Sequence, residues 1–372
     1  MENRKIRVAI THGDTNGIGY ELIFKTFAET GLTDLCTPII YGSPKVAAYH
    51  HNAFNLPCNF ATITHASDAG EGRLNMLTAV ENDVKVDLGQ STPEAAHAAM
   101  TALDRAILDY RDDLFDVLVT LPMNLSDIQS EGMRFKSQGN YIEKCIGGGH
   151  KALEMLVDGA MRVASVTGHL PIKDVPSALT KETLIERATV FSSTLRRDFH
   201  IDTPRIAVLA LNPDTGNGGQ AGLEEQEIIA PAIAELAENG IYAFGPFASE
   251  TFFDGNAYTH FDGILSMYND QGTTPIKAFC YEGCTHVTAG LPLVHTAPAI
   301  GVSYEQVGKG HANENLLRQA IYLAIDIYRH RENYDAPLAH PLKKLYREKR
   351  DDSEKVRFAV SRSKGERAVD KA

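Results

Sequence analysis

The sequence lacks the features that mark membrane, secreted and zinc-binding proteins. No apolar run approaches the ~20 residues that cross a bilayer, and the N-terminus has no apolar segment of the kind found in signal peptides. The five cysteines include no pair with two-residue spacing, so they do not predict a structural zinc site. We therefore expect a cytoplasmic protein with reduced thiols.

Basic charge is also scarce over most of the chain. The formal net charge is −12, which argues against nucleic acid as a partner because a protein that neutralises phosphates needs a basic face. The exception is the C-terminal end, where residues 341–372 contain eleven Lys or Arg and six Asp or Glu. We interpret residues 336–372 as a basic extension that is solvated rather than a binding arm.

The length and the order of the expected elements indicate an α/β protein of two domains. At roughly 100–200 residues per domain, 372 residues are long for one core. Short apolar runs alternate with segments of helical periodicity. The expected strands span residues 6–11, 37–42, 116–121, 162–167, 205–211 and 264–267, and the expected helices include residues 21–25, 45–49, 181–199, 224–238 and 313–328.

A long helix is predicted to begin at Pro93. Thr92 suits its N-cap, Pro93 suits the first helical position, and Glu94 suits the first turn. We expect the apolar residues that recur at helical spacing to be buried. They are Ala95, Ala99, Leu103, Ala106 and Ile107. A second N-cap is expected at Thr180, before the helix that starts at residue 181.

Polar residues follow the apolar run at residues 264–267, and the rest of the site is predicted around them. Asn269, Asp270 and Gln271 come directly after this run, and Gly272 is expected to turn the chain. Open α/β sheets bind ligands at the carboxyl ends of their strands. The segment therefore predicts either a ligand site or an ordinary polar turn.

Three strand ends offer different kinds of cation ligand: His169, Asp214 and Asn269. With one nitrogen ligand among them, the set favours Mg²⁺ or Mn²⁺, with Zn²⁺ or Co²⁺ as alternatives. Further along the chain, Lys277, His286 and His295 could hold a phosphate or a carboxylate. Each of these residues also has a structural interpretation, as a turn former, a hydrogen-bonded histidine or a surface lysine.

The N-terminal strand runs into a glycine-rich loop, residues 12–19, and then into a helix. This order suits a ligand that is held by backbone N–H groups at a helix start. The glycine spacing matches neither the dinucleotide fingerprint nor the Walker A loop, so a tight strand-to-helix turn explains the loop equally well.

Several segments, taken together and in order, resemble the 4-hydroxythreonine-4-phosphate dehydrogenase family of pyridoxal phosphate biosynthesis. The segments are residues 11–19, 167–171 with 174–176, 211–213 with 218–219, 267–272 and 290–292. The resemblance covers roughly residues 5–330. Each segment alone is weak evidence, but their joint order is specific.

The resemblance implies a two-domain fold like that of isocitrate and isopropylmalate dehydrogenases, with a cleft between the domains. Residues 1–135 with 297–335 would form the first domain, and residues 136–296 the second, which carries the metal and substrate loops. It also implies a homodimer with the site at the subunit interface. The reaction would be oxidation of 4-phosphooxy-L-threonine by NAD or NADP, assisted by a divalent metal, and loss of CO₂ to give 3-amino-2-oxopropyl phosphate.

The metal site carries over from the family with changed ligands. The family places three histidines on the metal, but only His169 matches here, and the other two positions are Asp214 and Asn269. Lys277 does match, and we expect Lys277 and Asp270 to be catalytic. No cofactor-binding residues are assigned.

The substrate pocket departs further. The family's phosphate-binding Arg falls at His295 and its substrate-binding Asn falls at His286, while the Gly-His-Thr-Glu loop appears as residues 139–142. A histidine only partly replaces the bidentate fork of an arginine. The expected substrate-binding residues are Asn140, Tyr141, Lys277, His286 and His295.

Three alternatives stay open from the sequence. The altered pocket favours a dehydrogenase of the same fold that acts on another phosphorylated hydroxy acid. A phosphate acyltransferase of the related fold would need no NAD. A non-catalytic binding protein that kept the scaffold would bind no divalent ion.

Overall fold

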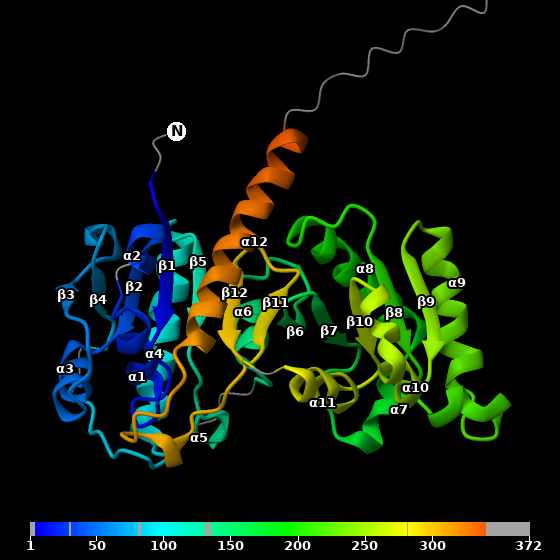
Figure 1. Cartoon of the computed structure of the whole chain (residues 1–372), viewed down its shortest axis with the longest axis horizontal. Coiled ribbons are helices and arrows are strands. Elements are labelled where there is room, and N and C mark those ends of the chain that lie inside the picture. The colour runs from blue at the N-terminus through cyan, green and yellow to red at the C-terminus, as the bar shows by residue number, and fades with distance from the viewer. Residues whose placement is uncertain (1–3, 30, 81–82, 131–134, 281, 340–372) are drawn as a thin grey trace, which may run out of the picture.

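A computed structural model describes residues 4–29, 31–80, 83–130, 135–280 and 282–339. Within these residues, twelve strands form one sheet in the order β3-β4-β2-β1-β5-β12-β11-β6-β7-β10-β8-β9 (Figure 1). The α/β class predicted from the sequence is confirmed. The strands are β1 Ile6–Thr11, β2 Cys36–Gly42, β3 Phe60–Ile63, β4 Leu74–Thr78, β5 Val117–Thr120, β6 Leu153–Asp158, β7 Met161–Ser165, β8 Arg205–Leu209, β9 Tyr242–Phe247, β10 Gly263–Ser266, β11 Thr285–Ala289 and β12 Val294–Pro298.

The direction of the strands reverses across the middle of the sheet. The six strands from β3 to β12 are mutually parallel, and so are the four from β7 to β9. Between these blocks, the pairs β12–β11, β11–β6 and β6–β7 are antiparallel. The two parallel blocks therefore run in opposite directions, and their strands end at opposite edges of the sheet.

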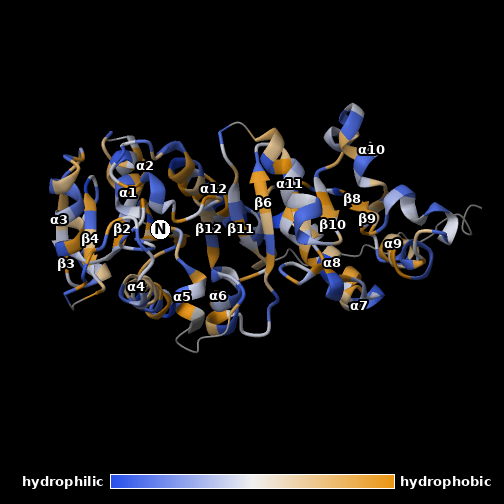
Figure 2. Cartoon of the chain, turned by 90° about the horizontal axis from the view of Figure 1, so that it is seen from below, coloured by the Kyte–Doolittle hydropathy of each residue, from blue (hydrophilic) through white to orange (hydrophobic). Residues whose placement is uncertain are grey.

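Helices cover both faces of the sheet (Figure 2). Apolar side chains lie between the layers, as expected for a sheet that is buried on both sides. The helices are α1 Gly19–Thr26, α2 Gly31–Leu35, α3 Pro44–Ala53, α4 Pro93–Arg111, α5 Leu125–Ser130, α6 Gln138–Ile146, α7 Val175–Ala178, α8 Lys181–Arg197, α9 Ala230–Glu238, α10 Ser249–Phe253, α11 Asn269–Phe279 and α12 Asn315–Ala339.

The predicted helix starts are confirmed at α4 and α8. The Thr92 hydroxyl accepts a hydrogen bond from the Ala95 N–H at 3.3 Å, and the Thr180 hydroxyl accepts one from the Thr183 N–H at 3.1 Å. These bonds satisfy backbone donors that have no partner inside the helix. The apolar face predicted for α4 is buried as expected.

The predicted turn at Gly272 is wrong, because α11 begins at Asn269 and passes through Gly272. A Cβ atom at this position would lie 2.6 Å from both the Ser266 Oγ and the Val163 Cγ1 atoms. The glycine therefore allows α11 to pack closely on β7 and β10. Glycine is needed here for this close packing and not to form a turn.

Other element predictions were incomplete. No bounds were predicted for strands β3, β4, β6, β9, β11 and β12, and the helix expected over residues 224–238 starts with a π-helical turn at Glu225–Ile229. The last helix was expected to end at residue 328, but α12 continues to Ala339. The predicted basic extension therefore begins inside α12, and its residues 340–372 lie outside the described part of the chain.

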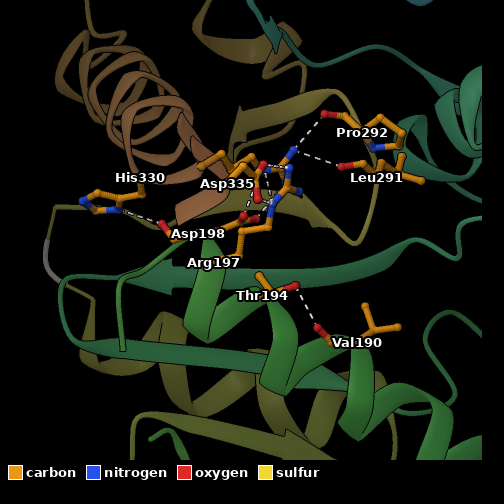
Figure 3. A network of polar contacts seen from close by, with 9 residues as sticks. Val190, Thr194, Arg197, Asp198, Leu291, Pro292, His330 and Asp335 are labelled. Carbon is orange, nitrogen blue, oxygen red and sulfur yellow. Dashed lines mark hydrogen bonds and ion pairs between the residues drawn. The ribbon is translucent and has the colours of Figure 1, made fainter. Parts of the chain in front are cut away.

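A buried ion pair fixes α12 against α8 and the turn between β11 and β12 (Figure 3). The Arg331 guanidinium donates two hydrogen bonds of 2.7 Å to the Asp198 carboxylate and further bonds to the carbonyls of Leu291 at 3.0 Å and Pro292 at 2.8 Å. Asp198 is the C-cap residue of α8. Residues 290–292 are one of the segments that carry the family resemblance. The structure shows that α12 contacts this segment.

The predicted division into two domains stays a prediction. The sheet is continuous across both proposed boundaries, and β12 at Val294–Pro298 spans one of them. None of the helices in the described part of the chain is both long and apolar enough to span a membrane.

Candidate active site

A cavity is bounded by the first turn of α6, by strands β6, β11 and β12, and by the loop after β7. Its volume is about 250 Å³, and an adjoining hollow adds about 190 Å³. Lys136 lines both spaces, and so do Ser137, Glu154 and His169, which form the polar wall between them. Together with His286 from β11, we call the three residues of this wall the Glu154 cluster.

Glu154 is the polar centre of this cluster. Its carboxylate accepts a hydrogen bond from the Ser137 hydroxyl, and its Oε2 atom lies 3.6 Å from Nδ1 of His169. Burial by itself raises the pKa of this carboxyl, but the interactions with His169 and Ser137 outweigh burial and lower it. In turn, the Glu154 carboxylate raises the pKa of His169. The two side chains therefore favour the charged forms of each other.

Sequence reasoning missed Glu154, although a signal was present. Glu154 is the only charged residue in the run Leu153–Val157, which otherwise consists of apolar side chains in a central strand. Charged residues are seldom buried without a partner. A lone carboxylate in such a strand predicts a partner from another segment, but not which one.

The structure brings two of the three predicted metal ligands together. His169 and Asn269 line one recess beside Glu154 and His286. Asp214 is not among the residues that line this recess or the cavity. It is exposed in the turn after β8, with φ of 51°.

These donors do not fit the divalent metal that the resemblance implies. In the described residues, no three His, Cys, Asp or Glu side chains gather so that they could hold a metal ion. Nδ1 of His169 faces Glu154, which leaves one ring nitrogen for another ligand. Asn269 contributes a neutral amide, and this amide donates a hydrogen bond of 3.1 Å to Asp270. Mg²⁺ is usually held by carboxylates and substrate phosphates. The residues of one chain therefore do not form such a centre.

The predicted catalytic residues lie at the two ends of α11. Asp270 is exposed in the first turn, and Lys277 is exposed in the last turn. Lys277 is near enough to His286 for its charge to affect the pKa of that ring. Burial between protein atoms lowers the pKa of His286 to about 4, although the ring keeps contact with solvent in the cavity. His286 is therefore a neutral hydrogen-bonding group at pH 7.

His295 also lines the cavity, but both of its ring nitrogens are already occupied. The Thr120 hydroxyl donates to Gln138 Oε1 and accepts from Nε2 of His295 at 2.8 Å. Nδ1 then accepts from the Thr288 hydroxyl at 2.8 Å. Burial lowers the pKa of His295 to about 4. A neutral ring that is 3% exposed does not supply the positive charge that an arginine would give to a phosphate.

Of the two α6 residues that were predicted to bind substrate, one lines these spaces and the other does not. Asn140 lines the smaller hollow, and Ser137 and Gln138 line the larger space. Tyr141 is not among the lining residues, because its hydroxyl donates to Asp104 on α4 at 2.5 Å. Helical periodicity explains the difference: α6 begins at Gln138, so Tyr141 faces α4 and the core.

The N-terminal glycine loop is a buried turn. Residues 12–19 are buried throughout. A Cβ atom at Gly19 would lie 2.2 Å from the His12 carbonyl oxygen, and one at Gly17 would lie 2.4 Å from Val302. The glycines therefore permit close backbone packing. This supports the tight-turn interpretation of the loop over the interpretation as a ligand cradle.

Comparison with known proteins agrees with the resemblance seen in the sequence. Residues 34–324 match the family model described as pyridoxal phosphate biosynthetic protein PdxA. A 4-hydroxythreonine-4-phosphate dehydrogenase from Bacteroides thetaiotaomicron is 50% identical over 358 residues, which cover 96% of this chain and 98% of that protein. Another, from Sulfurihydrogenibium, is 32% identical and covers 88% of this chain and 100% of that protein.

Solved structures agree as well. A 4-hydroxythreonine-4-phosphate dehydrogenase from Klebsiella pneumoniae has a TM-score of 0.75 at 25% identity, over 88% of this chain and 99% of that one. The enzyme from Burkholderia phymatum has a TM-score of 0.71 at 26% identity, over 87% of this chain and 99% of that one. With a family model that spans most of the sequence and relatives that match along nearly their whole length, the chain belongs to the pyridoxal phosphate biosynthetic protein PdxA family.

Proposed function

We propose that the protein is an NAD- or NADP-dependent dehydrogenase that oxidises 4-phosphooxy-L-threonine in pyridoxal phosphate biosynthesis. The observation that carries this proposal is the 50% identity, over 96% of the chain, to a protein named for this activity. In the reaction, the substrate's secondary hydroxyl loses a hydride to the nicotinamide and a proton to the protein. The resulting 3-oxo acid then loses CO₂ and takes up a proton, which gives 3-amino-2-oxopropyl phosphate.

The walls of the cavity support separate places for the cofactor and the substrate. An apolar end, formed by Leu121, Pro122, Met123, Ile300 and Val302, suits the flat nicotinamide ring. The polar wall of the Glu154 cluster faces the same space. A hydroxyl held by this wall lies beside the ring that accepts its hydride.

The smaller hollow is the place we propose for the substrate phosphate. Lys136 and Arg187 both line it, together with the polar side chains of Ser137 and Asn140. Cationic side chains with several donors are the usual partners of phosphate groups. They compensate for the neutral ring of His295. We propose that Lys277 and Asp270, at the ends of α11, take part in the proton transfers.

Two further expectations belong to this proposal. As in the family that the sequence resembles, the protein would act as a homodimer in the cytoplasm. A second copy of the chain would then close the cavity from outside.

The test is reduction of NAD and, separately, NADP by the full-length protein with 4-phosphooxy-L-threonine as substrate. Formation of 3-amino-2-oxopropyl phosphate with either cofactor would support the proposal. Nicotinamide binding without turnover would contradict this substrate. The two single variants Lys136→Met and Arg187→Met should each raise KM for this substrate, because each removes a cation from the hollow proposed for the phosphate.

A second candidate is a dehydrogenase of the same fold for another phosphorylated hydroxy acid. The specific observation that favours it is the buried, neutral His295, which changes the pocket at the family's arginine position. A panel of phosphorylated hydroxy acids, assayed in the same way, separates the two candidates. The preferred substrate is the one with the higher kcat/KM.

A further inference from the structure

We propose that the cavity binds its substrate without a divalent ion, and that Glu154 is a positioning residue that holds His169 toward the substrate. The second part rests on the proposed function. Both parts start from the disagreement between the implied metal centre and the donors that the chain provides.

The first turn of helix α6 fixes the position of the Glu154 side chain. Ser137 is the N-cap residue of α6, and its hydroxyl accepts a hydrogen bond from the Asn140 N–H at 3.1 Å. The same hydroxyl donates its proton to the Glu154 carboxylate. Because a hydroxyl has one proton and can also accept, both bonds form together. The carboxylate is therefore tied to the first turn of a helix, and its orientation is fixed before any ligand binds.

The loop after β7 fixes the position of His169. Gly168 has φ of +60°, which turns the chain so that the imidazole reaches the cavity. The loop is tied to the neighbouring strand end, since both the N–H and the hydroxyl of Thr167 donate to the Met267 carbonyl, at 3.2 and 2.9 Å. With Nδ1 directed at Glu154, the other ring nitrogen points away from the carboxylate. It is the atom of His169 that is available to a molecule in the cavity.

A carboxylate behind a histidine is also the arrangement found behind metal-bound histidines. The difference here is in the remaining ligands. A metal ion needs at least two more strong donors, and Asn269 is the other predicted ligand that lines the recess with His169. Glu154, which accepts a hydrogen bond from Ser137, and the His286 ring line the same recess, but in the described residues they do not form, with His169, a group that could hold a metal ion. The oriented imidazole therefore faces substrate in place of an ion.

The first experiment measures metal content. The full-length protein is treated with a chelator, dialysed against Mg²⁺, Mn²⁺ or Zn²⁺, and its bound ions are counted by plasma mass spectrometry. We expect no stoichiometric ion and no change of melting temperature with any of the three. One ion per chain that is lost in the His169→Ala variant would overturn the proposal, and would mean that a second copy of the chain completes a metal site.

The second experiment tests the positioning role with Glu154→Gln. Loss of the charged contact should raise KM for 4-phosphooxy-L-threonine about tenfold, with a smaller change in kcat. Glu238→Gln, the same change at an exposed position on α9, should leave both constants unchanged. A Glu154→Gln enzyme with the KM of the wild type would refute the role.

The third measurement separates this inference from the proposed function, because it needs no turnover. Nitrogen-15 NMR of the histidine rings, at a pH where they are neutral, reports which nitrogen of His169 carries the proton. We expect Nδ1–H in the wild type and a mixture of tautomers in Glu154→Gln, with the signal assigned by His169→Gln. Identical tautomers in both proteins would overturn the positioning role even if the protein reduces NAD. Absence of NAD reduction with the expected tautomers would count against the proposed reaction alone.

Discussion

Replacing Arg331 by methionine should destabilise the protein much more than any surface ion-pair variant. Arg331 is 6% exposed and Asp198 is 2% exposed, and four hydrogen bonds leave the guanidinium. The variant leaves the Asp198 carboxylate and the Leu291 carbonyl oxygen buried without their donor, and it removes the donor of the part-buried Pro292 carbonyl (Figure 3). Removing one partner of a buried pair costs about 3–5 kcal/mol.

The expected change of melting temperature follows from the size of the chain. At roughly 2.1 cal/mol/K per residue, the 372 residues give an unfolding entropy of roughly 0.8 kcal/mol/K. A loss of about 4 kcal/mol therefore lowers the melting temperature by roughly 5 °C. Thermal unfolding followed by circular dichroism measures this directly.

The neighbouring pair Arg197–Asp335 supplies the matched control. Its side chains are 35% and 48% exposed, so Arg197→Met should cost no more than about 1 kcal/mol. In addition, the double variant Arg331→Met with Asp198→Leu should regain much of the lost stability, because no buried charge remains. Equal shifts for Arg331→Met and Arg197→Met would refute the reasoning that burial decides the cost.

The remaining predictions concern packing, pH and substrate contact. Gly272→Ala should lower the unfolding free energy by about 1–3 kcal/mol, since its Cβ would lie 2.6 Å from atoms of the strands that α11 packs on. Gly31→Ala is the control: a Cβ there meets open space, so the change should be neutral or slightly stabilising. Urea titrations measure both. Burial lowers the pKa of His295 from 6.5 to about 4, so the stability that the neutral ring contributes is present above pH 6.5 and is lost as the pH falls from 6.5 toward 4. When the pH is lowered from about 7.5 to 5, the unfolding free energy should therefore fall by roughly 2 kcal/mol less in His295→Gln than in the wild type. Equal falls in the two proteins would contradict a buried, neutral His295 ring. Tyr141→Phe removes the hydroxyl that donates to Asp104 and interacts with Cys145, so it should leave KM unchanged and cost about 1 kcal/mol of stability. A raised KM would mean that Tyr141 contacts the substrate.

Local signals in the sequence predicted the elements that depend on local chemistry. The starts of α4 and α8 were predicted because a threonine hydroxyl bonds a backbone N–H three residues along the chain. The role of Gly272 was predicted wrongly, because it depends on atoms of β7 and β10 that are distant in sequence. The end of α12 was missed because its last turns are held by Arg331 and Asp198, which lie 133 residues apart.

The candidate site shows the same limit more strongly. His169 and Asn269 could be placed near each other because both follow neighbouring parallel strands, β7 and β10. The link from Glu154 to Ser137 depends on how α6 meets β6, which no motif encodes. Burial keeps His295 neutral, and this burial depends on β12 lying beside β5, where His295 also meets Thr120, a residue 175 positions away in the sequence.

The place of β12 in the sheet has a consequence for synthesis on the ribosome. β5 is completed at residue 120, but the strand that covers its free edge begins at residue 294, and β1 occupies the other edge. At roughly 5–20 residues per second, the ribosome takes on the order of 10–30 s to make the intervening segment. For that time the nascent N-terminal part presents an unpaired apolar strand edge, which is a site for aggregation or chaperone binding. Truncated chains that stop before residue 294 should therefore be found in the insoluble fraction, while chains that include α12 remain in solution.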